Sequence, residues 1–164
     1  MKAQLLTMST PDGPFTIIAR DGAVLASGWT AQSAELTGQI HPDLLPDEFV
    51  PALELGGISD AVAAFYDGDP EPAMRVRVLQ KSGPFRSHAW DVLRTVSPGR
   101  PVTYTEYAEL SGNPKAVRAA ASACALNAAA LFVPCHRVVR TDGTLGGFRW
   151  GLAIKESLLG REQR

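Results

Sequence analysis

The chain has 164 residues, of which 45% are hydrophobic and 20% are charged. This composition is typical of a folded protein with one sizeable core or two small lobes. No apolar run approaches the roughly 20 residues that a membrane-spanning helix needs, and the first residues lack the apolar stretch of a signal peptide. We therefore expect a cytoplasmic protein that does not associate with membranes.

The cysteines and histidines indicate neither a disulfide nor a metal site. The chain has two cysteines and three histidines, and no two of them have the close spacing of metal ligands. A disulfide is not expected in a reducing compartment. We expect no cofactor and no bound metal.

The net charge of −1 hides an uneven distribution. Residues 1–83 contain 5 Lys/Arg and 11 Asp/Glu, whereas residues 84–164 contain 11 Lys/Arg and 6 Asp/Glu. This split predicts that the C-terminal half faces an anionic partner such as DNA. The alternative is a chance split between solvated faces.

The first half of the chain has the pattern of a small α/β domain. Asp-Gly pairs at 12–13 and 21–22 separate short apolar runs and predict two β-hairpins. The next expected elements are a loop over 30–50, a helix capped by Ser59 that runs to Tyr66, and a half-buried strand over 74–78. A domain boundary is expected near Lys81–Pro84.

Beyond that boundary the apolar residues recur at helical spacing. A helix is expected from Phe85 to Val96, and Thr103 with Glu106 forms a capping-box pattern that opens a second, short helix. Asn113 is expected to cap a third helix from Pro114 to about Leu126. Two helices joined by a turn containing glycine are a candidate helix-turn-helix, although most such pairs are only packed helices.

The third expected helix has features that suit a nucleic-acid groove. It carries Lys115 and Arg118 among mostly small side chains. Small side chains let a helix backbone approach a groove wall, and the two cations can meet phosphates or bases.

The pair Cys135–His136 is the chemical centre of the sequence. A thiol has a pKa of about 8.5, so it needs a base or a positive field to become a nucleophile. His136 is a candidate base, but neighbouring residues point in different directions, so a bridging water is expected to complete the proton relay. The carboxylates that can orient His136 are Asp142, Glu156 and Glu162.

For a Cys-His pair alone, a simpler interpretation is the commoner one: Cys135 is a small buried hydrophobic residue beside a surface histidine. We expect Cys124, in the alanine-rich helix, to be a core residue.

The motifs around Cys135 resemble the signature of the methylated-DNA–protein-cysteine methyltransferases (alkylguanine-DNA alkyltransferases). They are most similar to the C-terminal domain of the bacterial adaptive-response protein. The matching residues are Trp90, Gly99, Tyr104, Gly112, Asn113, Pro114, Lys115, Ala116, Arg118, Asn127, Pro134, Cys135, His136, Arg137, Val138, Val139, Gly143, Gly147, Gly151, Lys155, Leu158, Leu159 and Glu162. They cover about half of the chain.

The resemblance implies a two-domain fold. Residues 1–80, which match only loosely, are expected to form an α/β domain with a ribonuclease-H-like sheet. Residues 84–164 are expected to form a mainly α domain with a winged-helix-like helix-turn-helix.

The resemblance also implies roles for individual residues. Cys135 accepts the alkyl group, His136 takes its proton through water, and Glu162 orients His136. Asn127 holds the DNA-binding helices against the cysteine loop, and Tyr104 helps to turn the nucleotide out and donates to the guanine ring. Because the thioether product has no evident route to hydrolysis, each molecule is expected to react once.

The implied partner is double-stranded DNA that contains alkylated guanine, with no obligate protein partner. The second helix of the pair is expected in the minor groove, where Arg118 fills the stack left by the extruded base. The expected DNA-contacting residues are Tyr104, Thr105, Asn113, Lys115 and Arg118.

The substrate pocket departs from the family pattern. Its expected lining is Pro134, Val138, Phe148, Arg149 and Trp150. Phe148 stands where many members have tyrosine, and Trp150 replaces a small residue of some members. We therefore expect good methyl transfer and poor acceptance of benzyl-sized groups. Asn127–Ala128 also replaces the Asn-Pro step common in the family.

Three other functions are alternatives to this one. Alkyltransferase-like proteins bind lesions without chemistry, but they lack the cysteine that is present here. A methylation-sensing transcriptional regulator would need a metal-binding cysteine cluster, which this sequence lacks. A cysteine hydrolase on an unrelated fold would regenerate Cys135 and turn over many times.

Overall fold

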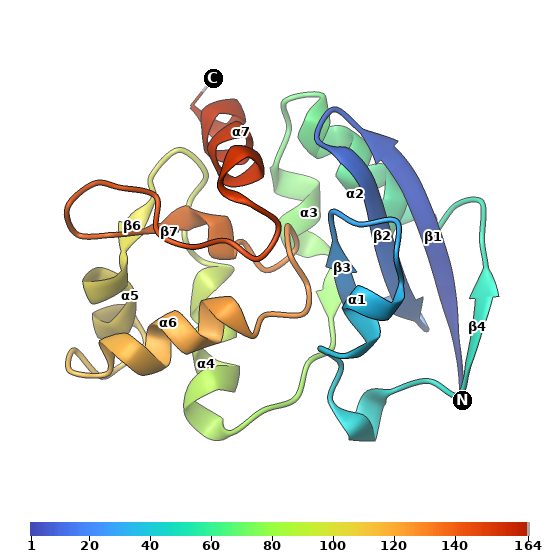
Figure 1. Cartoon of the computed structure of the whole chain (residues 1–164), viewed down its shortest axis with the longest axis horizontal. Coiled ribbons are helices and arrows are strands. Elements are labelled where there is room, and N and C mark those ends of the chain that lie inside the picture. The colour runs from blue at the N-terminus through green and yellow to red at the C-terminus, as the bar shows by residue number, and fades with distance from the viewer. Residues whose placement is uncertain (164) are drawn as a thin grey trace. The chain divides into compact units, whose positions relative to one another are not determined.

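A computed structural model describes residues 1–163 (Figure 1). The chain divides into two compact units. The first consists of residues 1–81 and 128–132, and the second of residues 82–127 and the chain from Val133 onward. Within the described residues, no helix is long and apolar enough to cross a membrane.

The first unit is built on a five-stranded mixed sheet with strand order β4-β1-β2-β3-β5. Its strands are β1 (Lys2–Thr10), β2 (Gly13–Arg20), β3 (Ala23–Gly28), β4 (Glu48–Pro51) and β5 (Arg77–Val78). Strands β1, β2 and β3 are antiparallel neighbours, and β4 and β5 add in parallel at the two edges. Asp21 (φ 51°) and Gly22 (φ 77°) make the tight turn between β2 and β3, so both predicted hairpins are confirmed.

Two stretches of the first unit differ from the prediction. The expected loop over 30–50 contains helix α1 (Ala34–Thr37), a 3-10 turn and the edge strand β4. The first two residues of the strand expected over 74–78 belong to helix α3 (Glu71–Arg75). These elements are short, and the strands form only because distant partners are available, which local sequence patterns do not report.

The helix predicted from Ser59 begins two residues earlier, as α2 (Gly57–Tyr66). Ser59 is therefore not its N-cap. Its hydroxyl lies inside the first turn, where it accepts from the Leu55 amide (2.9 Å) and donates to the Gly56 carbonyl (3.1 Å). The predicted end is confirmed, because Gly68 adopts φ 100° just beyond Tyr66.

The segment 128–132 returns to the first unit, which no local pattern in the sequence predicts. The Ser27 amide donates to the Ala128 carbonyl (2.8 Å), and the Ser27 hydroxyl donates to the Ala130 carbonyl (2.8 Å). The Ala128 amide donates to the side chain of Gln80 (2.9 Å). These bonds anchor the chain between Asn127 and the Cys135 segment.

The second unit is mainly helical. Its helices are α4 (Pro84–Leu93), α5 (Tyr104–Leu110), α6 (Val117–Ala125) and α7 (Leu152–Glu162). The strands β6 (Val102–Thr103) and β7 (Val138–Val139) form a parallel pair. The Tyr107 hydroxyl donates to the Ala89 carbonyl (2.6 Å) and the Trp90 indole donates to the Ala123 carbonyl (2.9 Å), so α4 is tied to both α5 and α6.

The predicted capping box is confirmed at the start of α5. Thr103 accepts from the Glu106 amide (3.1 Å), and Glu106 accepts from the Thr103 amide (3.0 Å). The next helix, however, begins at Val117 rather than at Pro114. Asn113 caps only a turn, in which its side-chain oxygen accepts from the Lys115 amide (3.1 Å). Lys115 therefore lies before α6 and not on it.

Candidate functional site

Cys135 opens a short 3-10 turn, Cys135–Arg137, that leads directly into β7. In the parallel pair, Val138 of β7 lies opposite Val102 of β6, and β6 leads into α5, whose first residue is Tyr104. The strand pair thus fixes the cysteine turn beside the start of the helix pair formed by α5 and α6.

Asn127 holds the cysteine turn from the end of α6. Its side-chain nitrogen donates to the Val133 carbonyl (2.9 Å) and contacts the Cys135 sulfur at 3.3 Å. Asn127 and Cys135 are 4% and 8% exposed. One amide group therefore orients the loop and offers a hydrogen bond to the sulfur, which strengthens when the sulfur is ionised.

Cys135 rests as a thiol. Burial raises its pKa, while the Asn127 hydrogen bond and the positive charge of Lys155 act in the opposite direction without cancelling it. To act as a nucleophile, the sulfur would therefore have to lose a proton, which requires a base nearby. Cys124, expected in the core, is only partly buried.

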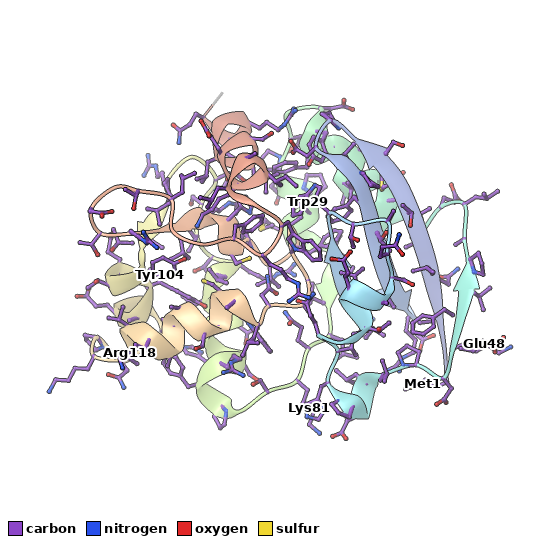
Figure 2. All side chains as sticks on the ribbon, in the orientation of Figure 1. Met1, Trp29, Glu48, Lys81, Tyr104 and Arg118 are labelled. Carbon is purple, nitrogen blue, oxygen red and sulfur yellow. The ribbon has the colours of Figure 1, made fainter. Side chains whose placement is uncertain are left out.

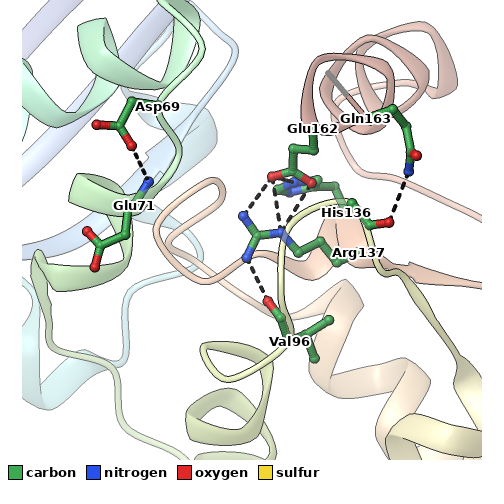
Figure 3. Close-up of polar contacts among 8 residues, drawn as sticks. Asp69, Glu71, Val96, His136, Arg137, Glu162 and Gln163 are labelled. Carbon is green, nitrogen blue, oxygen red and sulfur yellow. Dashed lines mark hydrogen bonds and ion pairs between the residues drawn. The ribbon is translucent and has the colours of Figure 1, made fainter.

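His136 is paired with Glu162, at the end of α7 (Figure 3). The two groups approach to 3.0 Å, between Nε2 and Oε2, and both side chains are 1% exposed. An ionised carboxylate only accepts hydrogen bonds, so Nε2 carries the ring proton and Nδ1 is left as the acceptor. Burial lowers the pKa of His136, despite the opposing pull of Glu162, which leaves the imidazole neutral and able to take a proton.

Of the three candidate carboxylates, Glu162 is thus the one that meets His136. Asp142 instead accepts from the backbone and hydroxyl of Thr144 (3.0 and 2.7 Å) in an exposed turn. Glu156 is exposed on α7.

Arg137 also binds Glu162, which sequence reasoning missed. Its Nη2 donates to Oε2 at 2.6 Å and its Nε lies 3.1 Å from the same oxygen, while Nη1 donates to the Val96 carbonyl (2.8 Å). Arg137 is 1% exposed. The available signal was a lone arginine in an apolar stretch, since a buried arginine requires partners.

Lys155 is a second buried cation of the site, which the sequence marks only through the family resemblance. It is fully buried, and its ammonium group donates to the carbonyls of Val138 (2.8 Å), Leu145 (2.5 Å) and Gly147 (3.2 Å). It therefore holds the loop that follows β7 against the cysteine turn and brings a positive charge close to the sulfur.

Tyr104 packs against that same loop. A Cβ at Gly146, whose φ is 76°, would lie 3.1 Å from the Tyr104 ring, so only glycine fits there. The pKa of Tyr104 is raised to about 12, mainly by burial and further by the nearby Cys124 and Cys135. The phenol therefore remains protonated and can donate a hydrogen bond.

The remaining residues expected to meet DNA lie on the surface of the second unit. Figure 2 shows Tyr104 at the start of α5 and Arg118 near the start of α6. Thr105, Asn113, Lys115 and Arg118 are all exposed, and the hydroxyl groups of Thr105 and Thr141 lie 3.4 Å apart.

The residues expected to line the pocket fall into two groups. Pro134 and Val138 are buried on either side of Cys135 in the chain. Phe148 and Trp150 are half-buried just before α7, and the exposed Arg149 places its guanidinium carbon 5.3 Å from the centre of the Trp150 ring. Among residues 1–163, no group of three or more His, Cys, Asp or Glu side chains can hold a metal ion.

Comparisons with known proteins point to one family. Residues 84–164 match the sequence profile of the 6-O-methylguanine DNA methyltransferase DNA-binding domain. Over 158 residues the chain is 32% identical to the methylated-DNA–protein-cysteine methyltransferase of Shigella flexneri, covering 94% of this chain and 92% of that protein.

Two further relatives match about half of the chain. The chain is 55% identical over 78 residues to the bifunctional transcriptional activator/DNA repair enzyme Ada of Escherichia coli, and 48% identical over 79 residues to a methylated-DNA–protein-cysteine methyltransferase of Kluyveromyces lactis. These matches cover 48% of this chain in each case, but only 22% and 42% of the two relatives.

Solved structures share the fold. The Mycobacterium tuberculosis OGT in complex with DNA superimposes with a TM-score of 0.80 at 27% identity, over 98% of this chain and 92% of that one. The O6-methylguanine-DNA methyltransferase of Pyrococcus kodakaraensis, at 20% identity, gives a TM-score of 0.71 over 99% of both chains.

Proposed function

The chain belongs to the methylated-DNA–protein-cysteine methyltransferase family, and from that premise we propose that it repairs DNA by moving an alkyl group from the 6-oxygen of guanine to Cys135. The observation that carries the proposal is the arrangement at Cys135. A buried thiol accepts a hydrogen bond from Asn127 and is followed directly by an imidazole that is paired with a buried carboxylate.

The proposed reaction is a single displacement at the alkyl carbon. The bond from Cys135 sulfur to carbon forms as the carbon–oxygen bond breaks, and the electron pair of the broken bond stays with guanine. The thiol proton passes through water to His136, and guanine takes up one proton in exchange, so protons balance overall. The protonated Tyr104 donates to the guanine ring. Because the thioether is stable, each molecule reacts once.

The proposed substrate is alkylated guanine in double-stranded DNA, turned out of the stack. The sulfur must approach the carbon in line with the bond to oxygen, and a stacked base blocks that path. The helix pair α5–α6, whose first helix is capped, and the exposed cations Lys115 and Arg118 support contact with the minor groove. The M. tuberculosis relative, solved in complex with DNA, supports DNA as the partner. Thr105 and Asn113 are further proposed contacts.

We also infer the finer features that the family implies. The mixed sheet of the first unit supports a ribonuclease-H-like domain over 1–80, and the second unit supports a winged-helix-like domain over 84–164. We infer a cytoplasmic location, no cofactor and no obligate protein partner.

Intact-mass measurement tests the proposal. After incubation with an oligonucleotide that carries O6-methylguanine, the protein should gain one methyl group and then stop. The Cys135→Ser variant should gain none, whereas Cys124→Ser, the matched control, should gain one. Continued turnover with an unmodified protein would instead identify a hydrolase.

A further inference from the structure

We propose that Arg137 is a positioning residue for proton transfer. By sharing Glu162 with His136, it keeps the carboxylate ionised, so that the proton taken from Cys135 stops at the imidazole. This inference rests on the proposed function and deepens it.

The geometry joins three charged or titratable groups at one oxygen atom. Glu162 Oε2 lies 3.0 Å from His136 Nε2 and 2.6 Å from Arg137 Nη2. Arg137 Nε lies 3.2 Å from Oε1 and 3.1 Å from Oε2, so both carboxylate oxygens face the guanidinium group (Figure 3). A planar guanidinium group fits a carboxylate in this way, and it stays charged at any relevant pH.

The anchor of Arg137 on the opposite side keeps this geometry rigid. Its Nη1 donates to the Val96 carbonyl at 2.8 Å, and the whole residue is 1% exposed. A buried charge of this kind is costly unless it is paired. Arg137 is therefore held beside Glu162 by the surrounding structure and does not have the freedom of a surface ion pair.

Arg137 acts on both partners of the pair: it keeps the Glu162 carboxylate ionised, and it favours the neutral form of the His136 imidazole before the reaction. Burial alone would raise the pKa of Glu162, but the hydrogen bonds and charges of His136 and Arg137 hold it below its usual value. Arg137 also lowers the pKa of His136, because it opposes a second positive charge. Without Arg137, the pair would bind a proton more readily at rest, and the base would be occupied before the reaction begins.

The other charged groups near His136 do not replace Arg137. Glu162 and Lys155, both from α7, are the remaining charged groups that act on the imidazole in the described chain. The Lys155 ammonium group donates hydrogen bonds to three backbone carbonyls and does not contact Glu162 in them. Gln163, beside Glu162, is neutral and donates to the Gly99 carbonyl.

The test compares the pH dependence of single-turnover methyl transfer in the full-length protein and two variants. In Arg137→Gln, the midpoint at which the rate falls on acidification should move up by at least about one pH unit, and the rate should recover at higher pH. Arg137→Lys keeps the charge, so its midpoint should stay closer to that of the unmodified protein. A loss of rate by the same factor at every pH would show a structural role only and would overturn the proposal.

A second measurement keeps the proposal testable if Arg137→Gln does not fold. NMR titration of the unmodified protein should show that His136 is still neutral at its ordinary pKa of about 6.5. A titration midpoint above that value would overturn the proposal. The titration needs no DNA, so a protein that transfers no methyl group at any pH would refute the proposed function without deciding the role of Arg137.

Discussion

Gly99 lies directly against the backbone of Glu162. A Cβ on Gly99 would sit 2.9 Å from the Glu162 carbonyl oxygen, and Gly99 has a φ of 79°. The Gln163 side chain donates to the Gly99 carbonyl at 3.2 Å. The turn after α4 therefore packs against the end of α7, and this contact positions the Glu162 carboxylate that binds His136.

Gly99→Ala is expected to destabilise the second unit and slow methyl transfer. The positive φ alone costs about 1–3 kcal/mol for a non-glycine residue, and the Cβ must also push the Glu162 backbone aside. Urea unfolding measures the loss. Gly143→Ala is the matched control, because Gly143 has a φ of 86° but nothing within 4 Å of its Cβ position. An equal loss of unfolding free energy in the two variants would show that the contact between Gly99 and Glu162 does not position α7.

Removal of the Glu162 carboxylate should make stability depend less on pH. Because the pKa of Glu162 is lowered in the folded protein, its contribution is fully present above the usual value of 4.5 and is lost as the pH falls through the lowered value. Glu162→Gln also removes the charged partner of the buried Arg137, which should lower the free energy of unfolding by about 3–5 kcal/mol at neutral pH. The difference from the unmodified protein should therefore shrink on acidification.

Urea unfolding at neutral and acidic pH checks this prediction. Glu156→Gln, on the exposed side of the same helix, is the control and should change the free energy of unfolding by less than about 0.5 kcal/mol. A Glu162→Gln deficit that stays constant with pH would mean that folding does not lower the pKa of Glu162.

Asn127 is expected to set the acidity of Cys135. Asn127→Ala removes the donor to the sulfur and should raise the thiol pKa by about one unit, and Asn127→Asp should raise it further, because a carboxylate repels the thiolate. The pH dependence of alkylation by iodoacetamide, in a Cys124→Ser background, measures this. Asn113→Ala, at an exposed turn, serves as control. An unchanged midpoint in Asn127→Ala would mean that the Asn127 amide does not set the acidity of Cys135.

Local signals in the sequence predicted the elements that local chemistry determines. The two Asp-Gly hairpins and the capping box at Thr103 depend on residues within a few positions of one another, and all are confirmed. The edge strands β4 and β5 and the return of residues 128–132 depend on distant partners, so no local pattern indicated them. The sequence predicts a helix start at Asn113 because the Asn side chain suits a helix cap as well as a turn.

The candidate site also contains residues that the sequence predicts and contacts that only the folded chain shows. Cys135, His136 and Glu162 were predicted together because the family resemblance supplied the pairing, whereas the residues alone left three carboxylates open. The contacts of Arg137 and Lys155 were not predicted. Their importance lies in burial and in which oxygen atoms they meet, and both are properties of the folded chain.

Trp150 is expected to limit the size of the alkyl group. We propose that its bulky ring borders the pocket for the alkyl group and disfavours benzyl groups, so free benzylguanine should label the protein slowly. Trp150→Gly should raise the ratio of benzyl to methyl transfer at least about tenfold, which corresponds to about 1.4 kcal/mol. Trp150→Phe keeps most of the bulk and should change the ratio less. Rapid benzyl labelling of the unmodified protein would argue that Trp150 lies outside the pocket.

Arg118 is expected to act on DNA and not on the chemistry. Its exposed side chain near the start of α6 is proposed to fill the stack when the base is turned out, a step that a free base does not require. Arg118→Ala should therefore slow methyl transfer from duplex DNA much more than transfer from free O6-methylguanine. Lys115→Ala, which removes a nearby exposed cation, should instead weaken DNA binding for all sequences and reduce its salt dependence by about one counterion. If Arg118→Ala slowed both substrates equally, its effect would lie in the reaction centre, and the proposed role in base flipping would have to be given up.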